Sequence, residues 1–260
     1  MSRMAIRYCC VLLSFFFAGG VFADSSEKED SESGAVLEVP SLPHLRMDAE
    51  ARVIDIDATV CLHEGMLELV ACTVGTKEHE SVVAIKALPK HVHLMLVLLG
   101  VKPGGPARMV PIDEEKTRWR DIPARGHPID VSLVYTDASG EAIETPIEQF
   151  LQNSSSKAFP SSTFLFTGSG IHVVEGQTGV YLADQSGNFI SISNFGDEVL
   201  GRSESFSHAN EDLLWKVRGE GLPEIGEDVI LRLRPQKLLV ENEEGGESGV
   251  EEARDGGGER

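Results

Sequence analysis

The chain has 260 residues, of which 42 are acidic and 23 are basic, so its formal net charge is −19 at pH 7. An acidic protein repels nucleic-acid phosphates and anionic lipid headgroups over most of its surface. The composition therefore argues against nucleic acid and against an anionic membrane surface as partners.

Residues 1–23 have the features of a cleavable signal peptide. Two arginines precede an apolar stretch from Tyr8 to Phe17, and Val21 to Ala23 provides a cleavage site. The apolar stretch is about half the ~20 residues that a membrane-spanning helix requires. We therefore expect cleavage before Asp24, no stable membrane insertion after cleavage, and a location outside the cytoplasm, either periplasmic or secreted.

Acidic segments of low hydrophobicity flank the rest of the chain. Residues 24–34 and 241–260 contain almost no apolar side chains, so neither segment can bury enough surface to offset the entropy lost on ordering. We expect a disordered acidic linker at 24–34, one globular domain at 35–240 and a disordered acidic tail at 241–260. The domain is of ordinary size and long enough to build a core.

The first half of the domain contains strand patterns and one helix pattern. Arg52–Cys61 and Met66–Val74 flank a turn at His63–Gly65 and predict a hairpin. Ser81–Ala87 predicts a further strand. The aliphatic segment that begins at Pro89 and stops before Gly100 predicts a buried helix.

The second half is richer in strands. Ile129–Thr136, followed by the turn Asp137–Gly140, predicts a second hairpin, and Thr145 to Glu148 has capping-box spacing with proline at the first helical position, which predicts a short helix to about Gln152. Further strands are expected at Thr163–Thr167, Ile171–Glu175, Val180–Ala183, Asn188–Ser193 and Asp228–Leu233. The predicted fold class is α+β, a single domain dominated by antiparallel β-hairpins with one buried helix and one short capped helix.

The densest cluster of reactive side chains lies between Cys61 and Glu80. In an exported protein, Cys61 and Cys72 suggest a disulfide, but the expected hairpin separates them by about 17 Å and disulfide Cα atoms lie within about 7 Å. A second interpretation is a site for a divalent metal such as zinc at Cys61, Cys72 and His79, although the spacing matches no standard zinc module. The third is a pair of ordinary buried thiols. All three interpretations remain open on the sequence.

Several enzyme classes fail on their own motifs. A zinc-protease helix beginning at His79 would need a second histidine where Val83 stands, and one beginning at His63 would need it at Leu67. Cys9 and Cys10 lie in the expected signal peptide. The two cysteines that remain, Cys61 and Cys72, cannot ligate a four-cysteine iron–sulfur cluster. Neither a phosphate loop nor a dinucleotide fingerprint occurs, and Gly168–Gly170 lacks the spacing of a serine-hydrolase elbow. We predict no catalytic residue, no iron–sulfur cluster and no nucleotide.

Short segments in a fixed order carry a family resemblance: Cys61–Glu68, Ala71–Cys72, Gly75–Ser81, the helix ending at Gly100 with Pro103–Gly104, Phe166–Ser169 and Asn194–Phe195. In these segments the chain resembles the YdjY-type domain, a family of exported bacterial proteins of unassigned activity. The resemblance extends from about Val36 to Pro235, and Lys77–Ser81 is its most specific part. It implies one exported bacterial domain, and it implies no catalytic residue.

The preferred functional interpretation is a non-catalytic binding or interaction module outside the cytoplasm, acting on a protein or a small ligand. A charged loop between two apolar strands marks the candidate surface, whose residues are Cys72, Lys77, Glu78, His79, Glu80 and His93. The alternative is a metal-binding or thiol-redox protein that uses Cys61, Cys72 and His79.

Overall fold

The computed structural model of the chain describes residues 41–137, 139–153, 159, 164–173, 179–202 and 215–237. All of these residues belong to one compact unit. The predicted signal peptide, acidic linker and acidic tail lie outside the described residues. Within the described ranges, no helix has the length and apolar character needed to cross a membrane.

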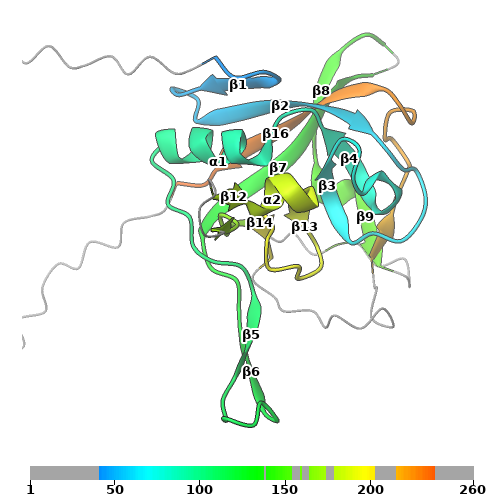
Figure 1. Ribbon diagram of the computed structural model, residues 1–260. Coiled ribbons are helices and arrows are strands. Elements are labelled where there is room, and N and C mark those ends of the chain that lie inside the picture. The colour runs from blue at the N-terminus through cyan, green and yellow to red at the C-terminus, as the bar shows by residue number, and fades with distance from the viewer. Residues whose placement is uncertain are drawn as a thin grey trace, which may run out of the picture. The chain divides into compact units, whose positions relative to one another are not determined.

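Eight strands form a closed β-barrel, whose central strands are visible in Figure 1. Around the barrel the strands follow the order β2 (Val53–Val60), β16 (Asp228–Pro235), β7 (His127–Thr136), β10 (Phe164–Phe166), β14 (Leu200–Gly201), β13 (Asn188–Ser191), β3 (Leu69–Thr73) and β4 (Ser81–Ile85). Strand β4 then pairs with β2, which closes the ring. The β13–β14 and β3–β4 pairs are parallel, and the other pairs in the ring are antiparallel.

The remaining elements extend or decorate this barrel. Strands β1 (Leu45–Asp48) and β8 (Ala142–Pro146) extend β2 and β7. Three two-stranded pairs join β5 (Arg108–Pro111) to β6 (Trp119–Ile122), β9 (Leu151–Asn153) to β15 (Trp215–Val217), and β11 (Ile171–His172) to β12 (Val180–Tyr181). The helices are α1 (Pro89–Leu98), α2 (Leu182–Ser186) and the 3-10 turns η1 (Glu78–Glu80) and η2 (Ile147–Phe150).

The predicted α+β class is wrong. The described residues are 44% strand and 13% helical, and the main sheet is a closed barrel rather than a set of hairpins with helices. Closure depends on pairs such as β2–β16 and β3–β13, whose members are far apart in the sequence. A local hydrophobic pattern predicts that a segment is a strand but does not identify a distant partner.

The first predicted hairpin is also wrong, although both of its strands exist. Strand β4 lies between β2 and β3, antiparallel to the former and parallel to the latter. Cys72 is therefore opposite Ala84 of β4 and Asn188 of β13, not opposite Ile56. The hairpin register that separated the two cysteines along one ladder does not apply.

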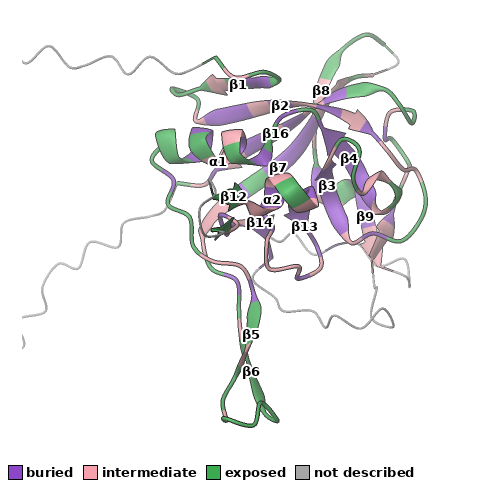
Figure 2. Ribbon diagram, in the orientation of Figure 1, coloured by how far each residue is buried: buried purple, intermediate pink, exposed green. Residues whose placement is uncertain are grey.

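Alternation along the strands separates the core from the outer face. Inward side chains such as Ile56, Leu133 and Leu231 are completely buried, as Figure 2 shows for the purple central strands. On the outer face, Arg232 of β16 donates to both carboxylate oxygens of Asp55 on β2, at 2.7 and 2.8 Å. The same guanidinium donates to Glu144 of β8 at 2.8 Å, so one arginine ties three strands together.

The predicted buried helix exists as α1, with proline at its first turn and Gly100 at a φ of +77° just beyond its end. Only one face is buried, through residues such as Val92 and Leu96, while Leu94 is 41% exposed. The predicted capped helix is wrong, because Thr145 and Pro146 complete strand β8 and only a 3-10 turn follows. The Thr145 hydroxyl hydrogen-bonds to the Tyr135 hydroxyl at 3.2 Å and caps no helix.

Candidate functional site

The charged loop selected from the sequence, Gly75–Ser81, is stabilised by contacts of its own side chains. The Lys77 ammonium lies 3.6 Å from the Glu80 carboxylate and 3.9 Å from the centre of the Phe195 ring. The Lys77 and Glu80 side chains are only 27% and 20% exposed, whereas that of His79 is 77% exposed. The loop thus presents His79 to solvent and uses Lys77 and Glu80 for internal contacts.

Further hydrogen bonds fix the backbone of this loop. The Glu78 carboxylate accepts from the backbone N–H of Gly75, and the Ser81 hydroxyl donates to the carbonyl of Lys77 at 2.8 Å. Glu68, which the sequence analysis did not select, lies close by, and burial together with the charge of Glu80 raises the pKa of its carboxyl. The conformation of the loop follows from these contacts without any ligand.

His93 is not brought to the loop. Its Nδ1 lies 2.9 Å from the Tyr181 hydroxyl, and its ring meets the Phe166 ring edge-on at 4.8 Å. These contacts lie at the start of α2, whereas the loop approaches the other end, where a Cβ on Gly187 would come within 2.3 Å of Thr76. Burial lowers the pKa of His93, which favours the neutral imidazole. Of the six predicted surface residues, Cys72 is buried and His93 stands apart.

Both cysteines of the domain are free thiols. Cys72 is fully buried in the sheet, and the Cys61 thiol donates to the carbonyl of Thr59 at 3.5 Å. Burial, together with the charges of Cys72 and Glu78, raises the pKa of Cys61 to about 12. Burial also raises the pKa of Cys72. Thiols in this state are poor nucleophiles and poor metal ligands, since both roles need the thiolate.

No group of three or more His, Cys, Asp or Glu side chains within the described ranges is arranged to hold a metal ion. In particular, the exposed ring of His79 pairs with Glu80 at 3.9 Å. Cys72 lies in strand β3 and Cys61 directly follows strand β2, whereas His79 lies in the exposed part of the loop.

A buried carboxyl group, that of Glu198, belongs to the segment that pairs with the turn at Gly168–Ser169. Glu198 is 1% exposed, and its Oε2 accepts from the backbone N–H groups of Gly196 and Asp197 at 2.7 and 3.1 Å. Its backbone carbonyl accepts from the N–H of Ser169 at 3.0 Å. Burial outweighs these hydrogen bonds and raises the pKa of Glu198 to about 7. The sequence pattern gave no sign of this carboxyl.

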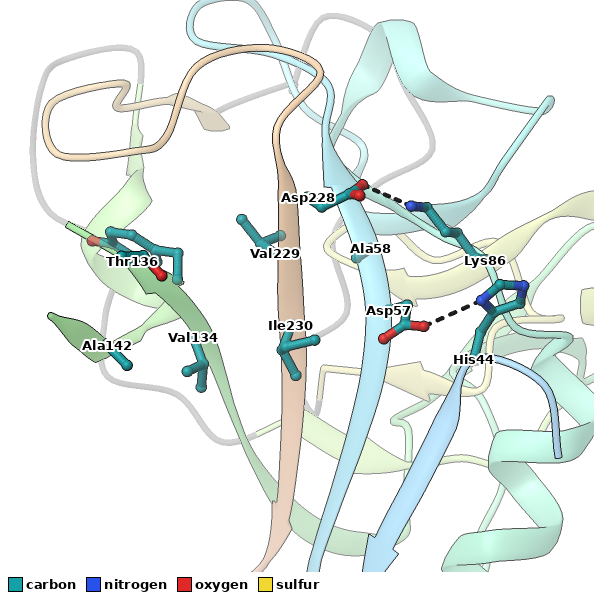
Figure 3. A pocket seen from close by; sticks show the side chains of 11 residues that line it. His44, Asp57, Ala58, Lys86, Val134, Thr136, Ala142, Asp228, Val229 and Ile230 are labelled. Carbon is teal, nitrogen blue, oxygen red and sulfur yellow. Dashed lines mark hydrogen bonds and ion pairs between the residues drawn. The ribbon is translucent and has the colours of Figure 1, made fainter. Parts of the chain in front are cut away.

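An open groove of about 440 Å³ lies on the outer face of the barrel, across β2, β16 and β7 (Figure 3). Its floor contains Val134 and Ile230, which are direct cross-strand partners. Both are half-buried, and their outward neighbours along the strands are polar: Ser132 and Thr136 on β7, Asp228 and Arg232 on β16. The groove therefore places an aliphatic pair between polar outward positions of β7 and β16.

One side of the groove is charged, as Figure 3 shows for His44, Asp57, Lys86 and Asp228. Lys86 and Asp228 form an ion pair at 2.6 Å, and His44 lies 3.2 Å from Asp57. Burial tends to raise the pKa of Asp57, but hydrogen bonds from Arg46 and His44 outweigh it and hold the pKa below its ordinary value. Each charge thus has a partner in the wall, next to the apolar floor.

The sequence analysis missed this groove, although one signal was present. In the β16 segment the outward positions are Asp228, Ile230, Arg232 and Arg234, so Ile230 interrupts a polar series. Val134 interrupts the corresponding series on β7. The coincidence becomes meaningful only once the register places the two residues opposite each other.

These observations define a class: a closed, mixed β-barrel domain with an open outer groove and, in its described part, no group of three or more side chains arranged to hold a metal ion. The profile of the YdjY domain matches residues 45–234, which is most of the chain, so the protein belongs to the YdjY domain family. The resemblance read from the sequence is confirmed. Neither a search of curated proteins nor a search of solved structures gave a match.

The cysteine environment predicts slow thiol chemistry. In the native protein we expect Cys61 to react with iodoacetamide on the order of a thousandfold more slowly than in guanidinium chloride, because a pKa near 12 leaves little thiolate. Peptide mass spectrometry measures both cysteines separately. Equal rates in the two conditions, or a peptide linked through Cys61 and Cys72, would contradict this arrangement.

The raised pKa of Glu198 predicts a pH dependence of stability. An ordinary glutamate has a pKa of 4.5, so the folded protein holds a proton that the unfolded chain releases as the pH rises. Stability should therefore fall by up to about 3 kcal/mol between pH 4.5 and 7 through this group. Denaturant unfolding of Glu198→Gln should lack this component, since the amide oxygen keeps the two backbone contacts. Parallel pH curves for the two proteins would refute the assignment.

Proposed function

We propose that this YdjY domain is a non-catalytic binding module that acts outside the cytoplasm and holds an apolar group of its ligand in the outer groove. The observation that carries the proposal is the Val134–Ile230 pair, an aliphatic patch whose outward neighbours along β7 and β16 are polar. Burial of one aliphatic side chain on such a patch contributes roughly 1.5–3 kcal/mol.

The form of the groove supports a small ligand or a short peptide. Its volume of about 440 Å³ lies within the usual range of ligand sites. Because Lys86, Asp228, His44 and Asp57 are already paired with one another, the charged wall offers hydrogen bonds at fixed positions rather than an isolated charge. The groove would therefore recognise a ligand by its shape and by apolar contact, and the charged wall would set the orientation of that ligand.

The loop Gly75–Ser81 remains a second candidate contact of the same module. His79 is its exposed side chain, while Lys77 and Glu80 support the loop from within. A partner that reaches this loop would contact the imidazole of His79, which lies beside the carboxylate of Glu80. The imidazole can form a hydrogen bond with a polar group of that partner.

Selection from a phage-displayed random peptide library on the purified full chain tests the groove. We expect enriched peptides that share a bulky apolar residue and bind about tenfold to a hundredfold more weakly to Ile230→Arg, because the lost apolar contact corresponds to roughly 1.5–3 kcal/mol. The substitution should not disturb folding, since Arg232 and Arg234 occupy the next outward positions.

The matched control is Ile225→Arg, at a residue that is 60% exposed and outside the groove. Peptides that bind wild type and Ile225→Arg equally, and Ile230→Arg poorly, support the proposal. No enrichment, or enriched peptides that bind Ile230→Arg as well as wild type, would overturn it.

The proposed location has its own test. Expressed with residues 1–23 in a bacterial host, the protein should be recovered outside the cytoplasm with an N-terminus at Asp24, as Edman sequencing would show. A control with Leu12 and Leu13 replaced by arginine should retain its N-terminus and stay in the cytoplasm. Cytoplasmic recovery of the wild-type chain would show that the segment is no export signal.

A further inference from the structure

Strands β5 and β6 form an arm that stands away from the barrel in Figure 1. Most of the arm is exposed in Figure 2, including Met109 at 49% and Trp119 at 48%. A two-stranded ribbon without a third strand or a helix against it is marginally stable in water. Large apolar side chains on such a ribbon are a feature of a contact surface.

The register of the arm gives one face a regular chemistry. Arg108 pairs with Ile122, and Val110 pairs with Arg120. One step further, the N–H of Ile112 donates to the carbonyl of Arg118. Side chains two apart on a strand share a face, so this face carries three arginines, each opposite an aliphatic residue. We call it the arginine face.

Two of these arginines, and a third at the base of the arm, lack an acidic partner among the residues that the structure describes. Arg118 is held by Asp113 at 3.2 Å, whereas Arg108, Arg120 and Arg125 make no ion pair there. Arg108 and Arg125 line a cleft of about 240 Å³ together with Ile122 and two prolines. This arrangement is unusual in a chain whose acidic residues outnumber basic ones by 19.

The base of the arm is fixed to the barrel. Gly105 and Arg125 exchange two backbone hydrogen bonds of 2.8 and 2.9 Å, and the N–H of Gly104 donates to the carbonyl of Phe166 on β10. A Cβ on Gly104 would stand 1.9 Å from the Arg125 carbonyl oxygen, so only glycine permits this approach. The cleft with its two arginines is therefore built on a rigid part of the fold.

We propose that the arginine face, together with Arg125 in the cleft at its base, binds an acidic segment of a partner protein. Guanidinium groups bind carboxylates through two parallel hydrogen bonds, and the aliphatic residues between them can cover apolar side chains of an extended peptide. Residues 102–125 contain six basic and four acidic side chains, which gives this part the opposite sign to the chain as a whole. The acidic body repels any anion, but it repels a nucleic acid with many phosphates more strongly than a short acidic peptide, so the peptide is the favoured occupant.

Fluorescence anisotropy with a labelled peptide of alternating glutamate and leucine, added to the full chain, tests this proposal. We expect binding that weakens with salt and falls at least about tenfold in Arg108→Ala/Arg120→Ala/Arg125→Ala. Substitution of the same positions by lysine should give an intermediate affinity, because the charge stays but the bidentate geometry is lost. All three arginines are exposed, so thermal unfolding should be unchanged in both variants.

The control is Arg218→Ala, an exposed arginine on the body that pairs with Glu220 at 2.9 Å. It should bind like wild type, and so should the groove variant Ile230→Arg, which separates this proposal from the proposed function. If binding is seen only after removal of residues 241–260, those acidic residues compete for the same face, which supports the proposal. Equal affinity of the alanine variant, or equal affinity for a lysine–leucine peptide, would overturn it. A dimer that the arginine substitutions dissociate would identify a second copy as the occupant and would also overturn it.

Discussion

The barrel depends on the pairing of strand β2 along both of its edges. One edge pairs with β16 from Ile54 to Thr59. The other is divided, with β1 beside Val53–Ile56 and β4 beside Ala58–Val60. The three residue pairs between β2 and β4 close the ring, and in a closed ring neither strand keeps a free edge at that point. Closure then defines an inside, which holds aliphatic side chains, and an outer face, which along β2, β16 and β7 carries mostly polar groups.

The outer face uses this division in two ways. One part of this face carries an ion-pair network across β2, β16 and β8, made by Arg232, Arg234, Asp55 and Glu144. Hydrogen bonds, of which that from Arg234 has the largest effect, lower the pKa of Glu144 to about 2. Along another part, the aliphatic pair of the groove replaces charged residues at equivalent outward positions. The first arrangement ties strands to one another, whereas the second leaves apolar surface accessible. The contrast distinguishes a structural region from a region available for binding.

Local patterns predicted α1 and seven of the eight barrel strands, because strand alternation, turn glycines and the proline at the start of α1 act within a few residues. They did not predict the barrel, whose closure is decided by contacts between residues near 55 and near 231. The same limit affected the site. The sequence could predict that Lys77, His79 and Glu80 share one loop. It could not predict three features that depend on the tertiary register of the strands: the burial of Cys72, the distance of His93 from that loop, and the pairing of Val134 with Ile230.

Four of the groups with perturbed pKa values are engaged in the fold. Glu198 accepts from the backbone of its own turn, Cys61 and Cys72 are retained as buried thiols, and Glu144 is clamped by arginines. A catalytic acid or base must reach a substrate from a cleft, with its pKa set for that task. The groove instead exposes an aliphatic pair beside charged side chains that are paired with one another, and the arginine face exposes guanidinium groups.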